Sequence, residues 1–103
     1  MKLHQLQYFC AACRNGNITR AAAELHVSQP SISMAIRELE NEFGILLLQR
    51  NNKGFEITRE GTYFYERATV LLEQADELNQ MMCDMGNQRK RINLGIPPMI
   101  GTF

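Results

Sequence analysis

The feature that most constrains the fold is a pair of helix-forming segments joined by a connection of only about three residues. Asn17 can cap a short first segment over residues 18–25, whose apolar side chains share one face. Ser28 can cap the second segment, predicted over residues 29–43. His26 lies in the connection, where it can adopt the positive φ that a tight turn requires. Two helices with so short a connection predict a helix-turn-helix.

The segments on either side predict further elements that pack with this pair. Apolar residues at helical spacing between Leu3 and Cys13, followed by Gly16, indicate a helix that precedes it. Between residues 46 and 58, two strand-like runs are separated by residues that favour turns, which predicts a β-hairpin, or wing. The sequence therefore predicts a mainly α fold, a winged helix-turn-helix of three helices plus a β-hairpin.

A fourth, long helix is predicted over residues 59–86, because Thr58 can cap it, no proline interrupts it and Gly86-Asn87 is a typical helix stop. Its apolar residues alternate at spacings of four and three, the pattern of the a and d positions of a coiled coil. They are Phe64, Ala68, Leu71, Ala75, Leu78, Met82 and Met85. No other segment of the chain is long enough to cover this seam. We therefore expect a second copy to cover it, in a homodimer.

The composition fits one small domain with an extension. A chain of 103 residues, 45% of them hydrophobic, supports one core but not two. Three cysteines are an odd number, and the sequence has neither a signal-peptide pattern nor an apolar run that could cross a bilayer. We therefore expect a cytoplasmic protein without a membrane partner. Cys10 and Cys13 lie on an apolar helix without any recognised metal-ligand spacing, so we expect them to pack as small hydrophobic side chains, with no metal site.

The charged residues are unevenly distributed although the formal net charge is zero. Neither residues 25–37 nor residues 43–55 include Asp or Glu, and the second window carries Arg50 and Lys53. A binding face for a polyanion needs only a local excess of cations. These two windows are therefore the candidate surfaces for nucleic acid.

The outward face of the helix at residues 29–43 carries side chains suited to a DNA major groove. Gln29 can pair with both polar groups on the edge of an adenine, and an exposed Met34 fits a thymine methyl group. The wing can reach phosphates or the adjacent minor groove. The residues that we expect at the DNA are Thr19, Ser28, Gln29, Pro30, Ser31, Ser33, Met34, Arg37, Arg50 and Lys53.

From Met1 to Thr58 the sequence resembles, without a gap, the LysR-type transcriptional regulators. The resemblance is carried by the run NITRAAAELHVSQPSIS from Asn17 to Ser33, then by Ile36, Leu39-Glu40, Phe43-Gly44, Gln49-Arg50, Lys53-Gly54 and Thr58-Arg-Glu-Gly61. It implies a winged helix-turn-helix at residues 1–58, a linker helix at residues 59–86 that pairs two subunits antiparallel, and an effector domain similar to periplasmic binding proteins. Residues 87–103 then correspond to a hinge and the first strand of that effector domain, almost all of which is missing.

The resemblance also implies roles at the DNA. It places base-edge contacts on Gln29, Pro30 and Ser33, phosphate contacts on Ser28, Ser31 and Arg37, and a wing contact on Lys53. Many members have arginine where this chain has Met34, so an apolar contact to thymine is expected there in place of a guanine contact. Lys53 stands where arginine is common, which keeps the charge but loses the planar fork of donors.

We therefore expect a sequence-specific regulator that binds an interrupted palindrome as a dimer, with the helix at residues 29–43 in the major groove and the wing beside it. The resemblance implies a small-molecule effector and a tetramer for the full-length protein, and no cofactor in these residues. One alternative is a coiled-coil module that recruits a partner protein. Another is an enzyme or thiol redox protein, but the sequence has no convergent set of acid, base and nucleophile.

Overall fold

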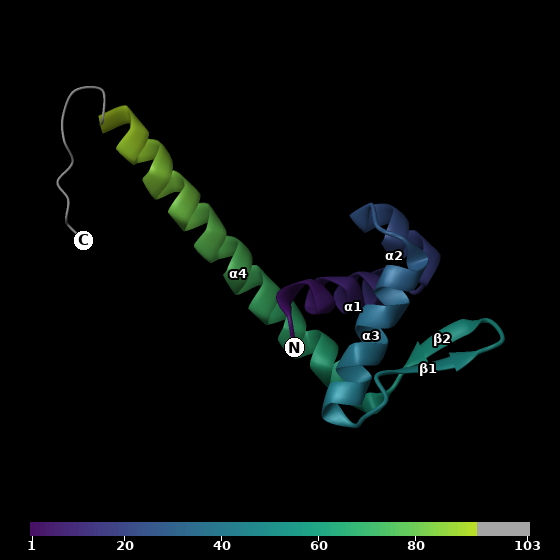
Figure 1. The fold of residues 1–103 in the computed structure, drawn as a ribbon. Helices are drawn as coiled ribbons and strands as arrows, with labels where there is room; N and C mark the ends of the chain where they lie inside the picture. The colour runs from purple at the N-terminus through teal and green to yellow at the C-terminus, as the bar shows by residue number, and fades with distance from the viewer. Residues whose placement is uncertain (93–103) are drawn as a thin grey trace. The chain divides into compact units, whose positions relative to one another are not determined.

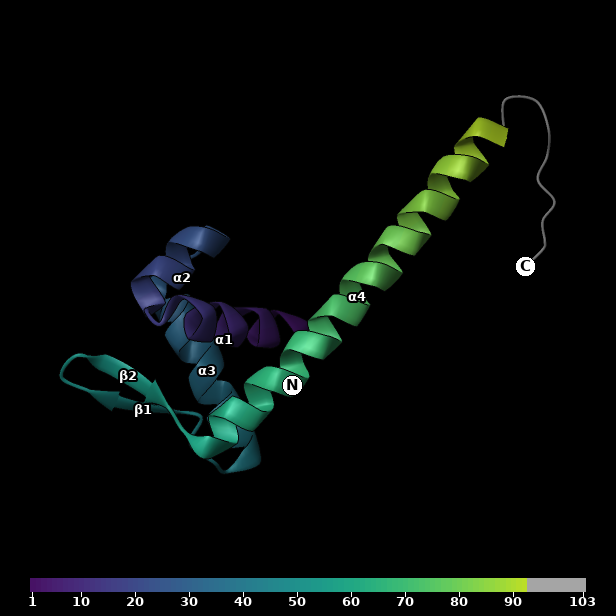
Figure 2. The same cartoon turned by 180° about the vertical axis from the view of Figure 1, so that it is seen from behind.

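In the computed structural model, which describes residues 1–92, Met1–Leu72 form one compact unit and the residues from Glu73 onward belong to a second. The elements are α1 (Leu3–Asn15), α2 (Ile18–Leu25), α3 (Gln29–Phe43), β1 (Leu48–Asn51), β2 (Gly54–Ile57) and α4 (Arg59–Ile92). Figures 1 and 2 show the two strands as a hairpin that extends away from α3. This order confirms the predicted mainly α fold, a winged helix-turn-helix followed by a long helix.

The ends of the first three helices follow the capping residues that the sequence predicts. Asn17 and Ser28 each accept a hydrogen bond from the backbone N–H three residues further on. Gly16 and Gly44 end α1 and α3 in the left-handed conformation, with φ of 64° and 66°. His26 adopts a φ of 58°, which confirms the expectation for this turn. The tight connection between α2 and α3 is therefore set by local chemistry.

The core of the compact unit lies where α1, α3 and the segment before β1 meet. Its largest fully buried side chains are Phe9, Ile32, Ile36, Leu39 and Leu47. Burial of each such side chain contributes about 1.5–3 kcal/mol. Small residues such as Ala21 and Ala22 are also buried and allow α2 to pack closely. The helical spacing of Ile32, Ile36, Leu39 and Phe43 predicts that all four face this core, and for Phe43 the prediction is wrong, because its side chain is 45% exposed at the end of α3.

The hairpin pairs antiparallel, with Leu48 opposite Ile57 and Asn51 opposite Gly54. Its first strand begins at Leu48 and not at Leu46 as predicted. Leu47 is completely buried, and its carbonyl accepts a hydrogen bond from the Thr58 N–H at 3.0 Å. Strand pairing thus starts two residues after the predicted position, directly after the buried Leu47. The base of the wing is thus fixed to the helical core.

The first turn of α4 is capped as predicted. Thr58 Oγ1 accepts a hydrogen bond from the Gly61 N–H at 2.9 Å and donates to the Leu46 carbonyl at 2.6 Å. The predicted stop at Gly86-Asn87 is wrong, because α4 continues to Ile92 and includes the first part of the predicted hinge. The rest of the predicted hinge and strand, residues 93–103, lies outside the described residues. No helix within residues 1–92 combines the length and the apolarity needed to cross a membrane.

The beginning of the predicted dimer seam packs into the core of its own chain. Ala68 is only 2% exposed and belongs to the core cluster, so it has almost no surface left for a second copy. Its assignment as a dimer contact is therefore corrected. Phe64 is partly buried, and its ring lies edge-on to Phe9 with the ring centroids 5.3 Å apart. The sequence pattern could not separate these two roles, because both place apolar residues at helical spacing.

Candidate nucleic-acid interface

The predicted interface is built around the first turn of α3, in which Gln29, Pro30 and Ser31 are all exposed. The cap Ser28 accepts a hydrogen bond from the Ser31 N–H at 3.2 Å, and the two hydroxyl oxygens lie 2.7 Å apart. The Gln29 N–H opens the helix and has no partner within it. The positive end of the helix dipole and several polar side chains thus face solvent together. This arrangement favours an anion such as a phosphate.

The outward face of α3 has the orientation that the helical spacing predicts. Pro30, Met34 and Arg37 are exposed, and Met34 exposes 58% of its surface. Ser33 is partly exposed beside them. The opposite face of the same helix supplies the buried side chains of the core. The predicted groove-facing residues therefore lie on one solvent-exposed strip of α3.

A hydrogen bond joins two residues of the predicted interface that lie on different helices. Gln29 Nε2, at the start of α3, donates to Thr19 Oγ1, near the start of α2, at 2.8 Å. Both side chains are exposed. The sequence pattern predicts both residues at the interface but not this bond, because the bond depends on how the two helices pack and leaves no local signal. A residue of α2 thus restrains the side chain of Gln29, the first residue of α3, through a hydrogen bond.

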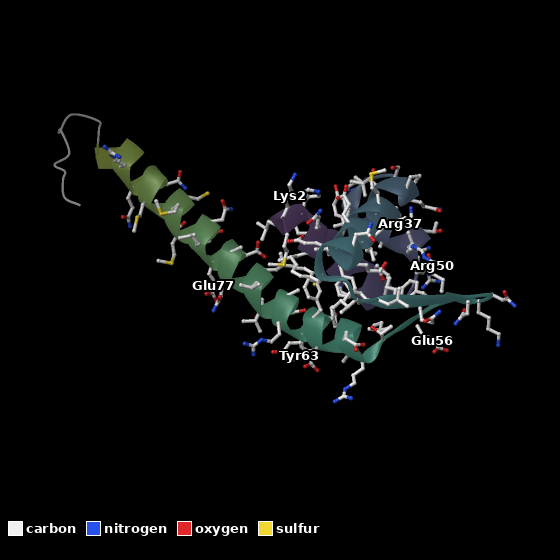
Figure 3. All side chains as sticks on the ribbon, turned by 60° about the horizontal axis from the view of Figure 1, so that its bottom comes forward. Lys2, Arg37, Arg50, Glu56, Tyr63 and Glu77 are labelled. Atoms are coloured by element: carbon white, nitrogen blue, oxygen red, sulfur yellow. The ribbon has the colours of Figure 1, made fainter. Side chains whose placement is uncertain are left out.

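The wing presents its cations on two separate parts of the hairpin. At its tip, the Lys53 N–H donates to Asn51 Oδ1 at 2.9 Å, and Gly54 follows with a φ of 133°. Arg50 lies opposite Phe55 in the register and therefore shares the hairpin face that packs on the core. Figure 3 shows Arg50 and Glu56 projecting from opposite faces, as the register requires. The acidic side chain of the hairpin thus points away from the face that carries Arg50.

Each carboxylate on the second half of α3 accepts a hydrogen bond or forms an ion pair within the chain. Glu38 accepts a hydrogen bond from Gln5 Nε2 at 2.8 Å, and Glu42 forms an ion pair at 2.8 Å with the terminal ammonium of Met1. Glu40 accepts hydrogen bonds from two backbone N–H groups at the base of the wing. These negative charges are directed toward α1 and the wing base. Residues 29–37, at the start of α3, include no Asp or Glu, and the exposed Arg37 is the last residue of this run.

The acidic residue on α2 is likewise paired within the chain. Glu24 accepts a hydrogen bond from Asn15 Nδ2 at 2.8 Å and forms an ion pair with Arg14. The hydrogen bond from Asn15, together with Arg14, lowers the pKa of the Glu24 carboxyl from its ordinary value. The Glu24 carboxylate therefore stays charged but is compensated by α1. The positive side chains Arg37, Arg50 and Lys53 take part in no salt bridge within the described part of the chain.

Two residues that carry the sequence resemblance have structural roles that the sequence did not reveal. Glu40 Oε2 accepts the N–H groups of Leu47 and Leu48 at 2.8 Å and 3.1 Å. Gly61 lies so close to the Leu47 carbonyl that a Cβ atom built on it would be 2.1 Å from the oxygen. Both residues thus fix the wing base against the helices. Their positions in the quoted motifs were the only signal that could have singled them out.

The Cys-x-x-Cys pair belongs to the packing of α1. Cys10 is buried in the core, and Cys13 packs against it partly exposed. Burial raises the pKa of both thiols, and it raises that of Cys13 to about 12. Thiols with such pKa values are almost entirely protonated at neutral pH and react slowly. Within residues 1–92, no group of three or more His, Cys, Asp or Glu side chains is placed to hold a metal ion.

The rest of the predicted seam on α4 is exposed. Leu71, Leu78, Met82 and Met85 expose about half of their surface or more, between 45% and 59%. Ala75 lies between them, partly exposed. Near the first turns of α4, a groove is lined by Phe43, Ile45, Arg59, Glu60, Tyr63 and Phe64. An apolar stripe of this length on one helix is unusual for a surface that faces only water.

Residues 3–62 match the family model described as "Bacterial regulatory helix-turn-helix protein, lysR family". Among curated proteins, the Hca operon transcriptional activator HcaR of Escherichia coli (strain K12) is 38% identical over 98 residues. That alignment covers 95% of this chain and 33% of HcaR. The chain thus spans about a quarter to a third of the length of the curated relatives it matches.

Solved structures of DNA-binding domains have the same fold. The complex described as BenM_DBD/catB site 1 DNA aligns with a TM-score of 0.76 at 38% identity, covering 93% of this chain and all of that chain. The CbnR_DBD-DNA complex aligns with a TM-score of 0.76 at 38% identity, covering 84% of this chain and 99% of that one. Both of these related domains were crystallised with DNA.

Proposed function

Because this chain belongs to the LysR family of bacterial helix-turn-helix regulatory proteins, we propose that it is the DNA-binding part of a transcriptional regulator. The observation that carries the proposal is the exposed polar strip at the start of α3, which has no acidic residue and lies on the same compact unit as the cationic wing. A helix with this surface fits a major groove. Relatives such as HcaR, a transcriptional activator, and the DNA-bound BenM domain support this function.

We propose that each side chain type has its own role at the duplex. Gln29 would pair with adenine, and Met34 would contact the methyl group of a thymine. Ser28, Ser31 and Arg37 would bind phosphates, as would the wing through Arg50 and Lys53. Phosphate contacts position the domain, while the base contacts of Gln29, Pro30, Ser33 and Met34 would supply the sequence preference.

We further propose that two copies pair through α4 and bind an interrupted palindrome. The exposed apolar stripe at Leu71, Leu78, Met82 and Met85 supports this assembly, since a second copy would bury it. A two-fold dimer would place one α3 in each of two major grooves, and the symmetry of the protein would then dictate the symmetry of the site. We expect these contacts to form antiparallel, as the family resemblance implies.

The same family membership leads to proposals for the whole protein. We propose that this chain is part of a longer regulator, which also contains an effector domain that binds a small molecule. We propose that the longer protein assembles as a tetramer and acts on DNA in the bacterial cytoplasm. Its role would be regulatory and not enzymatic, in line with relatives that are named as transcriptional regulators. Selection of binding sites from random DNA by the purified chain would identify the site, its symmetry and its base preferences together.

The first prediction separates base readout from phosphate contact. We expect Gln29→Ala to reduce the preference for one base pair in each half-site, because the adenine-pairing amide is lost. We expect Lys53→Ala to weaken binding to all sequences alike and to reduce the slope of log K against log salt by about one unit. Titrations of fluorescent duplexes at several salt concentrations measure both effects.

Each outcome of these titrations bears on the proposal. An unchanged base preference in Gln29→Ala would remove this residue from base readout. A chain that dimerises but shows no salt-sensitive binding to any duplex would contradict the proposed function and favour a coiled-coil module that recruits a partner protein. Glu77→Gln, on an exposed part of α4, serves as a control that should not change the base preference.

A further inference from the structure

The hydrogen bond between Gln29 and Thr19 places one donor of the Gln29 amide before any DNA is present. Gln29 Nε2 donates to Thr19 Oγ1 at 2.8 Å across the helix-turn-helix. The N-cap of α2 does not need this threonine, because Asn17 accepts the Arg20 N–H at 2.9 Å. The Thr19 hydroxyl is thus available to hold a side chain of another helix.

The remaining atoms of the Gln29 amide match what an adenine edge requires. A glutamine amide has one carbonyl oxygen and two N–H donors. With one N–H bound to Thr19, the carbonyl oxygen and the second N–H stay available, and these are the acceptor and the donor that the N6 and N7 atoms of adenine need. The bond therefore fixes the amide plane without using up the group that reads the base.

Fixing the amide also matters for discrimination, since a free glutamine side chain has many rotamers. An unrestrained amide could rotate and offer its N–H group to the acceptors of guanine instead. A side chain held in one geometry in the free protein loses less conformational entropy on binding. Because Thr19 is exposed, its own hydroxyl hydrogen is available to donate to a phosphate oxygen. Such a donation would strengthen the bond from Gln29 by polarising the hydroxyl.

We propose that Thr19 is a positioning residue that sets the base preference of Gln29 and links it to a phosphate contact, although Thr19 itself touches no base. This inference rests on the proposed DNA-binding function. It adds to that function a specificity-determining residue on α2. It differs from a simple phosphate contact, which would strengthen binding to all sequences equally.

The test compares Thr19→Val with Thr19→Ser in the purified chain. Valine keeps the shape and the β-branch but lacks the hydroxyl, whereas serine keeps the hydroxyl. Two duplexes are titrated with each variant: the selected site, and the same site with G·C in place of the base pair whose preference depends on Gln29. We expect Thr19→Val to reduce the preference between these duplexes by about three- to ten-fold, the effect of one neutral hydrogen bond. We expect Thr19→Ser to retain most of it.

The double variant Thr19→Val with Gln29→Ala separates positioning from independent contacts. If Thr19 acts through Gln29, the double variant has the base preference of Gln29→Ala alone. Equal weakening of both duplexes by Thr19→Val, with an unchanged preference, would overturn the inference and leave the proposed function intact. Failure of the unmodified chain to bind either duplex would overturn both. Thermal unfolding followed by circular dichroism verifies that the variants keep the fold.

Discussion

At the scale of single residues, Gly61 controls how closely α4 approaches the segment that leads into the wing. The position of a Cβ atom at Gly61 would lie 2.1 Å from the Leu47 carbonyl oxygen and 2.9 Å from a methyl group of Ile57. Backbone oxygen cannot move aside as the end of a flexible side chain can. Only glycine therefore avoids a steric clash at this position, although alanine is the better helix former.

We predict that Gly61→Ala destabilises the compact unit by about 1–3 kcal/mol, because the added methyl group must displace the backbone at Leu47. The midpoint of urea unfolding measures this change. Gly86→Ala is the matched control, since Gly86 also lies within α4 but nothing is within 4 Å of its Cβ position. There the same substitution should stabilise the helix by about 0.5–1 kcal/mol. Equal unfolding midpoints for Gly61→Ala and the unmodified chain would contradict the steric argument.

The residues that were predicted correctly from the sequence are those whose roles are local. Asn17, Ser28 and Gly16 act on backbone groups a few positions away, so their spacing alone predicts the helix ends. The bond from Gln29 to Thr19 and the close approach at Gly61 depend on the packing of separate elements. Such contacts leave no periodic or compositional signal, and only the three-dimensional arrangement reveals them.

At the scale of elements, α3 and the wing are joined by one carboxylate. Glu40 projects from the second half of α3 and accepts hydrogen bonds from the Leu47 and Leu48 N–H groups at 2.8 Å and 3.1 Å. Both leucines are buried, so these two donors have little access to water. The orientation of the wing relative to the proposed recognition helix thus depends on a charge-assisted pair of hydrogen bonds.

We predict that Glu40→Ala destabilises the compact unit by about 1–3 kcal/mol, because it leaves two buried backbone donors without a partner. The control Glu42→Ala removes an equal side chain from the same helix. It breaks an exposed ion pair with the Met1 ammonium, which contributes about 0–1 kcal/mol. Urea unfolding of the three proteins measures the difference. A smaller loss in Glu40→Ala than in Glu42→Ala would show that the carboxylate does not hold the wing base.

The length of α4 shows why a helix end is harder to predict than a helix start. Gly86-Asn87 has the composition of a stop, yet Gly86 lies inside the helix with open space around it. A glycine within a helix costs about 1 kcal/mol relative to alanine, which good helix formers nearby can offset. Two of the residues that follow, Gln88 and Arg89, are such formers.

At the scale of the whole molecule, the seam on α4 is symmetric about residue 73. Leu71 and Ala75 lie equally far from this point, and so do Phe64 and Met82. In an antiparallel pair centred there, Met82 of one copy would lie opposite Phe64 of the other, beside the groove that Phe64 helps to line. Methionine side chains adapt to irregular apolar surfaces. The exposed side chain of Met82 would then be covered by the start of the second α4.

We predict that oxidation distinguishes this antiparallel pairing from a parallel one. In the antiparallel pair, the exposed Cys83 residues of the two copies would be separated by about 30 Å along the helix axis, which no disulfide can span. The unmodified chain should therefore sediment as a dimer but remain unlinked on a non-reducing gel. Leu71→Cys combined with Ala75→Cys, in a Cys83→Ser background, should form a covalent dimer and is the positive control for oxidation. Cys10 and Cys13 should not compete, because burial raises the pKa of both thiols and keeps them protonated. Cross-linking of the unmodified chain through Cys83 at a rate that does not depend on protein concentration would instead require the two Cys83 residues of one dimer to lie close together, and it would contradict the antiparallel pairing.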